Sequence, residues 1–150
     1  ALLNWREGSR LCALPFEAVG LASGVERLVH DFWGRASLGI ATHAVGRRIG
    51  ARASLLLAVR ANQERPQLIG TDRHVAMGAV ELADLAWDHA ARTLRGRAAP
   101  EPMSLILRCP HPFAPAEAAG GALGTLAEAR VALSLPAAGR WREWSVTFGR

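Results

Sequence analysis

The stretch TDRHVAMGAVELADLAWDHAARTLRG, residues 71–96, contains the longest helical pattern in the chain. Apolar residues recur in it at the spacing of an amphipathic helix, and a narrow polar stripe lies opposite them. The apolar face consists of Val75, Ala79, Leu82, Leu85, Ala86 and His89. Thr71 or Asp72 is a suitable N-cap, and Gly96 is a suitable stop signal. The pattern therefore predicts a central helix over residues 73–94.

Two shorter segments also predict helices. Residues 23–26, Ser-Gly-Val-Glu, match the capping box, in which the serine hydroxyl and the glutamate side chain satisfy backbone donors at a helix start. An apolar face at helical spacing follows over residues 25–33. A second helical period over residues 38–49 places Leu38, Ala41, Val45 and Ile49 on one side.

Short apolar or alternating runs between these helices predict strands, which cover residues 11–16, 53–60, 67–69 and 103–109. The chain ends in an expected β-hairpin, in which residues 131–135 and 144–148 alternate apolar and polar side chains. We therefore expect a single α+β domain over residues 1–150. Its largely antiparallel sheet has about five strands, with about three helices packed on one face.

All 18 positively charged side chains are arginine, and the chain contains neither lysine nor tyrosine. Schiff-base catalysis and the phosphate-binding loop of P-loop NTPases both need a lysine, so these function classes are excluded. The formal net charge of +5 suits nucleic acid, an anionic membrane or an acidic protein as partner. A GC-rich genome also favours arginine over lysine, so the charge alone selects none of these partners.

The two cysteines, Cys12 and Cys109, are too few for a disulfide framework or a zinc cluster, although one bridge between them is conceivable. No apolar run reaches the roughly 18 residues of a membrane span, and residues 1–6 lack a signal-peptide core. The five histidines show no metal-ligand spacing. We therefore expect a cytoplasmic protein without a transmembrane segment, a metal site or a cofactor.

The segment Gly70-Thr71-Asp72-Arg73-His74 joins a predicted strand to the start of the longest predicted helix. Free backbone amides and the helix dipole favour an anion at such a place. A hydroxyl, a carboxylate, a guanidinium and an imidazole converge there, which suits acid–base chemistry. The alternative is that Thr71 or Asp72 only caps the helix while Arg73 and His74 are solvated. This segment is the candidate anion-binding site.

Arg47, Arg48 and Arg52 form the densest basic patch, interleaved with Gly46 and Gly50. Glycines beside arginines let a backbone approach phosphates, which makes nucleic acid a candidate partner. The nearby sequence has no stacking aromatic residues and no recognised nucleic-acid motif. A solvated or acid-paired surface is the alternative interpretation.

Cys109 and His111 stand two residues apart at the end of a predicted strand, so their side chains share a face and could form a Cys–His nucleophile. Cys109 also continues the apolar face of Met103, Leu105 and Leu107, which instead predicts a packed, inert thiol. Reactivity toward a thiol reagent in the native state distinguishes the two.

The last predicted hairpin contains a candidate protein interface at Arg140, Trp141, Arg142 and Glu143. The alternation of this strand turns Trp141 and Glu143 away from the core. A tryptophan flanked by arginines has the composition of an interaction hot spot, and an edge hairpin lets a partner strand or a second subunit add on. Alternatively, a helix or the N-terminal segment with Trp5 covers Trp141.

These features predict a non-catalytic protein-interaction or assembly module, which binds a protein partner or self-associates through the edge of the C-terminal hairpin. The alternative is a small enzyme or anion-binding protein that uses residues 70–74. A third reading is an arginine-based nucleic-acid binder. No residue is assigned a catalytic role.

Overall fold

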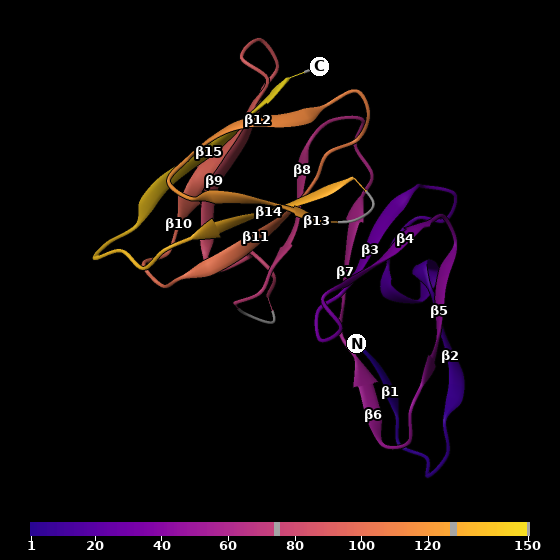
Figure 1. The fold of residues 1–150 in the computed structure, drawn as a ribbon. Coiled ribbons are helices and arrows are strands. Elements are labelled where there is room, and N and C mark those ends of the chain that lie inside the picture. Colours follow the sequence, from indigo (N-terminus) through magenta and orange to yellow (C-terminus); the bar gives the residue numbers. More distant parts are fainter. Residues whose placement is uncertain (74–75, 127–128, 150) are drawn as a thin grey trace. The chain divides into compact units, whose positions relative to one another are not determined.

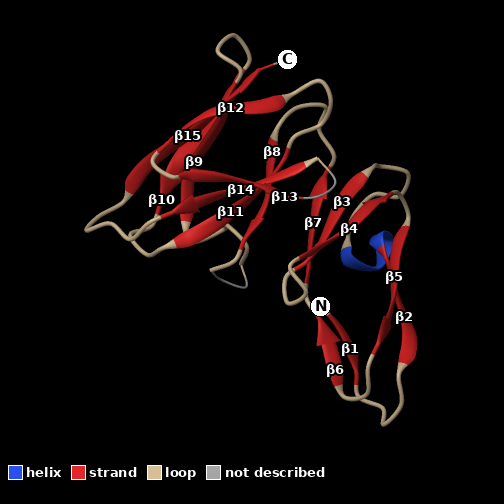
Figure 2. Cartoon of the chain, viewed as in Figure 1, coloured by secondary structure: helices blue, strands red, loops and turns tan. Residues whose placement is uncertain are grey.

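The computed structural model describes residues 1–73, 76–126 and 129–149. Over these residues the chain forms fifteen β-strands and one short 3-10 helix, η1 (Phe16–Val19) (Figure 2). The predicted α+β class, with three helices packed on a sheet, is therefore wrong, because the chain is nearly all β. Among the described residues there is no helix with the length and hydrophobicity needed to cross a bilayer.

The chain divides into two compact units, Ala1–Asn62 (unit 1) and Gln63–Arg150 (unit 2). Each unit has its own cluster of buried apolar side chains. The single domain expected over residues 1–150 stays a prediction, because two compact units can still unfold in one cooperative transition. Calorimetry tests this, since a cooperative domain gives one transition and independent units give two.

Unit 1 lies wholly within the described residues and contains seven short strands in three small sheets. The pairs are β1 (Leu2–Asn4) with β6 (Ala53–Leu55) and β2 (Arg10–Pro15) with β5 (Ala44–Ile49), while β3 (Arg27–Asp31) lies between β4 (Ala36–Ala41) and β7 (Leu57–Ala61). Its buried core is small and centres on Phe16, Val29 and Val45. Large apolar side chains such as Trp5 and Trp33 are left more than half exposed.

Unit 2 is a sandwich of two four-stranded antiparallel sheets over its described residues (Figure 1). Sheet I has the order β12 (Ala114–Ala119), β15 (Arg142–Gly149), β10 (Thr93–Ala98), β9 (Leu82–Asp88). Sheet II has the order β13 (Ala122–Leu126), β14 (Arg130–Leu135), β11 (Met103–Arg108), β8 (Gln67–Thr71). One core forms from the inner faces of both sheets. It includes Leu94, Trp144, Val146 and Phe148 of sheet I, and Leu105, Leu107, Leu133 and Leu135 of sheet II.

The predicted helix over residues 73–94 is wrong, because β9 and β10 form a hairpin there. The turn between them begins at Asp88, whose Oδ1 accepts hydrogen bonds from the backbone amides of Ala90 and Ala91, each at 2.9 Å. In β10 the burial alternates, so that Leu94 and Ala98 are buried while the residues beside them point outward. Frequent alanines supply apolar positions at helical spacing, but the sandwich buries one face of each strand, and tertiary burial overrides helix propensity.

The two shorter predicted helices are wrong as well. Residues 25–33 contain β3, and residues 38–49 contain parts of β4 and all of β5. Ser23 Oγ lies 2.7 Å from His43 Nδ1, and Glu26 Oε2 accepts a hydrogen bond from Asn62 at 2.7 Å. Both residues of the expected capping box therefore bind distant parts of unit 1 instead of a helix end.

The strands expected at the C-terminus exist, but the hairpin between them is wrong. β14 pairs with β11 and β13 in sheet II, whereas β15 pairs with β10 and β12 in sheet I. The connection through residues 136–141 thus carries the chain from one sheet to the other. The alternation was read correctly because both strands turn their apolar faces to a shared core, and alternation alone does not identify the pairing partner.

Candidate functional site

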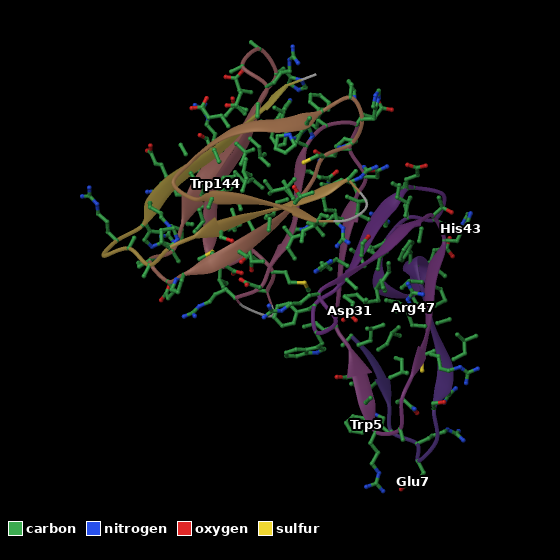
Figure 3. The ribbon with its side chains drawn as sticks, in the orientation of Figure 1. Trp5, Glu7, Asp31, His43, Arg47 and Trp144 are labelled. Carbon is green, nitrogen blue, oxygen red and sulfur yellow. The ribbon has the colours of Figure 1, made fainter. Side chains whose placement is uncertain are left out.

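The outer face of sheet I presents a row of polar side chains from two neighbouring strands. β10 and β15 pair in register, with Arg95 opposite Ser145 and Arg97 opposite Glu143. Opposite residues of an antiparallel pair point to the same face, with Cβ atoms about 4.5–5.5 Å apart. Since the alternate residue Trp144 is buried in the sandwich (Figure 3), these four polar side chains point outward.

A β-bulge in β9 brings a carboxylate to this row. Between Arg95 and Arg97 the register with β9 shifts, because Asp84 and Leu85 together face the single residue Gly96. Asp84 adopts a left-handed backbone with φ of 54°. Bulges re-aim the side chains next to them, and here Asp84 reaches the outer face of sheet I.

Arg97 is the centre of the resulting cluster. Its Nε donates a hydrogen bond to Asp84 Oδ2 at 2.6 Å, and both side chains are at least half exposed. Its guanidinium carbon lies 5.9 Å from the ring centroid of Trp141, within the range of a cation–π contact. Trp141 is 42% exposed. Arg97 therefore joins a carboxylate on one side to an accessible aromatic ring on the other.

Glu143 stands opposite Arg97 and is exposed. Among the described residues, its carboxylate has no partner in a hydrogen bond or an ion pair, and the Ser145 hydroxyl has none either. Thr93 differs, because its hydroxyl lies 3.0 Å from that of Thr147. The cluster thus combines one paired carboxylate, Asp84, with one that is available to a ligand, Glu143.

These residues surround an open hollow of about 600 Å³ on sheet I, which we call the hollow. Its polar lining comes from Asp84, Thr93, Arg95, Arg97, Glu143 and Ser145. Two small side chains, Ala86 of β9 and Ala119 of β12, also line it and leave the space unfilled. A volume of this size falls within the range of about 300–1,000 Å³ typical of small-ligand sites.

The predicted interface residues differ in their exposure. Arg140, Trp141 and Glu143 are exposed. Arg142 instead donates a hydrogen bond from Nη2 to the Glu101 carbonyl at 3.0 Å, and its Nε and Nη1 atoms are buried. The prediction that the last strand forms a sheet edge is wrong, because β15 lies between β12 and β10 and is hydrogen-bonded to both. Trp141 therefore belongs to a sheet face and not to an edge.

At the predicted anion site, residues 70–74, the described residues that follow β8 form turns and then β9 in place of the expected helix. The Thr71 hydroxyl donates to the buried Glu81 carboxylate, and Asp72 Oδ1 accepts a hydrogen bond from the Ser104 amide at 2.7 Å. Gly70 is buried, Arg73 is exposed, and His74 lies outside the described residues. An anion site here stays a prediction, tested by a phosphate-induced rise in melting temperature that Asp72→Ala abolishes.

The basic patch lies on β5 and in the turn that follows it. Arg47 and Arg48 are neighbours on β5, opposite Cys12 and Leu11 respectively, so they point to opposite faces. Arg52 forms an ion pair with Glu7. Arg47 and Arg48 nevertheless both contribute to the lining of one hollow beside Gly50. Nucleic-acid binding by these three arginines stays a prediction.

Cys109 is buried, and its backbone amide donates to the Ala129 carbonyl at 2.7 Å. Desolvation by burial raises the pKa of the Cys109 thiol to about 12. A thiol with that pKa stays protonated and is a poor nucleophile, while His111 is exposed. The packed, inert thiol is therefore the interpretation that the structure favours. Cys12 and Cys109 are both free.

Sequence reasoning missed Asp84, Arg95 and Arg97 as site residues, because it predicted a helix over residues 73–94 with Gly96 as its stop signal and therefore no strand at β10. A usable signal was present in Thr93-Leu94-Arg95-Gly96-Arg97-Ala98, where polar and small or apolar residues alternate with the period of a strand. The bulge at Asp84 had no such signal, since it depends on the pairing between β9 and β10.

Comparison of the chain with protein-family models, with curated proteins and with solved structures gives no match in any of the three. Within the described ranges, no three histidine, cysteine, aspartate or glutamate side chains are close enough to hold a metal ion.

Proposed function

We propose that the chain is a non-catalytic binding module whose binding surface is the hollow on sheet I and the adjacent Trp141. The observation that carries the proposal is the meeting of an open hollow, an accessible aromatic ring and convergent polar side chains at one place. Binding sites typically combine such a concave surface with a few placed polar groups. This surface includes Trp141, the residue at which the sequence predicts an interface, but it lies on a sheet face and not at a sheet edge.

The chemistry of the lining favours binding over catalysis. Asp84 and Glu143 are the two carboxyl groups of the lining, and both are exposed. General acid–base catalysis works best with a carboxyl group shielded from water, where its proton affinity can be tuned. Asp84 is in addition held by Arg97.

Fragment mapping tests this proposal without knowledge of the natural ligand. A mixture of small organic fragments is added to isotope-labelled protein, and backbone amide shifts are followed by NMR. The proposal expects the fragments to perturb amides of β9, β10 and β15 in preference to the rest of unit 2. It is wrong if the fragments gather elsewhere or bind nowhere.

Self-association, the other part of the sequence-based prediction, is a second candidate, located on unit 1. The observation that favours it is the exposure of Trp5 at 80%, Leu11 at 66% and Trp33 at 60%. Trp5 lies at the end of unit 1 beside Glu7 (Figure 3). Association of two copies would remove such apolar surface from water, which is favourable. Light scattering should then give a mass above 16.0 kDa that falls for Trp5→Ser, and a monomeric wild type rejects this candidate.

The predicted cytoplasmic location is part of the same proposal. Two free thiols support it, since disulfides are rare in reducing compartments. Fractionation of cells that produce the chain tests it directly.

A further inference from the structure

We infer that the hollow on sheet I binds a neutral saccharide, an inference that rests on the proposed function. The first argument is charge balance. Two carboxylates, Asp84 and Glu143, and two guanidinium groups, Arg95 and Arg97, line the same space. An anionic ligand in the hollow would be repelled by the two carboxylates, and a cationic ligand would be repelled by the two guanidinium groups. A ligand without net charge avoids both costs.

The second argument is hydrogen-bonding capacity. Carboxylates only accept hydrogen bonds and guanidinium groups only donate them, while the Ser145 hydroxyl does both. Adjacent hydroxyl groups of a sugar match such a mixture, because one hydroxyl can donate to Glu143 while the next accepts from Arg97. Asp84 occupies Arg97 Nε, which leaves the two outer nitrogens of that guanidinium for a ligand. Charged groups make the stronger hydrogen bonds, which compensates for the water displaced from each hydroxyl.

The third argument is the aromatic ring beside the hollow. Trp141 extends the surface beyond Arg97 and keeps 42% of its area accessible. A sugar ring has an apolar face of C–H groups, whose slight positive charge is attracted by the negative π-face of an indole. A volume of about 600 Å³ has room for more than one sugar ring. A short oligosaccharide can therefore contact the polar hollow and Trp141 together.

The test uses neutral oligosaccharides prepared from starch, cellulose, xylan and mannan as probes. Each is titrated up to millimolar concentration into the full chain, with amide shifts and calorimetry as readouts. Inorganic phosphate and a short mixed-sequence peptide are titrated in parallel. The inference expects at least one oligosaccharide to bind and to shift amides of β10 and β15. Binding of the peptide or phosphate at this face, with all four oligosaccharides silent, overturns it.

Matched variants locate the site. Glu143→Gln keeps the size of the side chain but removes the charged acceptor, and should weaken oligosaccharide binding about ten- to hundredfold. Glu117→Gln is the control, since Glu117 is an exposed glutamate on β12 of the same sheet that does not line the hollow. Equal affinity of both variants contradicts the inference. Because the ligand is neutral, raising the salt concentration should leave the affinity unchanged, whereas a charged ligand would lose affinity.

The two proposals can fail separately. If fragments bind the hollow while no oligosaccharide does, the saccharide inference is wrong and the binding surface stands. If oligosaccharides bind but shift only amides outside β9, β10 and β15, both the site assignment and the inference are wrong.

Discussion

Gly96 lies where the bulge of β9, the indole of Trp144 and the polar row of β10 meet, so Gly96→Ala tests whether this arrangement is as close as the structure indicates. A Cβ atom at Gly96 would lie 3.1 Å from the Ala83 carbonyl oxygen and 3.2 Å from Trp144 Cζ2. Neither neighbour moves freely, since one is backbone and the other is a buried ring. Overpacking of this kind costs about 1–3 kcal/mol.

The replacement of glycine also restricts the unfolded chain, which offsets about 0.4–1 kcal/mol of that cost. We therefore expect Gly96→Ala to lower the free energy of unfolding by about 1–2 kcal/mol, measured as a lower midpoint in urea at unchanged slope. Gly124→Ala is the matched control, because Gly124 is an exposed strand glycine with no atom within 4 Å of the added Cβ. If the two variants are equally stable, the close packing of β9, β10 and Trp144 is wrong.

Three further outcomes follow from buried or hydrogen-bonded groups. The pKa of the buried Cys109 thiol is raised to about 12, so this thiol should stay unreactive toward a thiol reagent at pH 8 in the native state. The half-buried Cys12 should react. Rapid labelling of both cysteines would contradict the burial of Cys109. The hydrogen bond from the Ala91 amide lowers the pKa of Asp88, so Asp88→Ala should destabilise the chain at neutral pH, and the difference should vanish as the pH falls below the ordinary carboxyl range. If the urea midpoints of the wild type and Asp88→Ala differ by the same amount at every pH, the charge of Asp88 is not the cause of the difference. Glu81 is 4% exposed and accepts a hydrogen bond from the Gly78 amide at 2.8 Å. Glu81→Ala should therefore lower the free energy of unfolding by about 1–3 kcal/mol, and Glu81→Gln should lower it less. Equal losses for the two variants would exclude this hydrogen bond as the cause.

The strands that were predicted correctly are those whose alternation repeats over several large side chains. Met103, Leu105 and Leu107 of β11 and Trp144, Val146 and Phe148 of β15 turn large side chains to one core, so their period is clear in the sequence. Pairing could not be predicted in the same way. The partners of β15 lie about 50 and 30 residues upstream, and only the folded core selects them.

The failure at β9 and β10 has a different cause. Small alanines between Leu82 and Leu94 fit both a helix face and a strand, and the turn at Asp88 is stabilised by hydrogen bonds that also suit a helix start. Because a helix was predicted, Asp84 and Arg95 were placed on its narrow polar stripe, and Arg97 was placed after its stop signal, Gly96. Trp141 was predicted as an interface residue from the alternation of the last strand and from its arginine neighbours, and this role stays a prediction.

The most direct test of the binding surface compares Ala86→Trp with Ala122→Trp. Ala86 lines the hollow, whereas Ala122 is an exposed alanine on β13 of the opposite sheet. The affinity to be measured is that of the tightest-binding probe, fragment or oligosaccharide, for each purified variant by calorimetry. We predict that the indole of Ala86→Trp projects into the hollow and blocks binding, while Ala122→Trp binds like the wild type. Unchanged binding to Ala86→Trp would contradict the assignment of the hollow as the functional site.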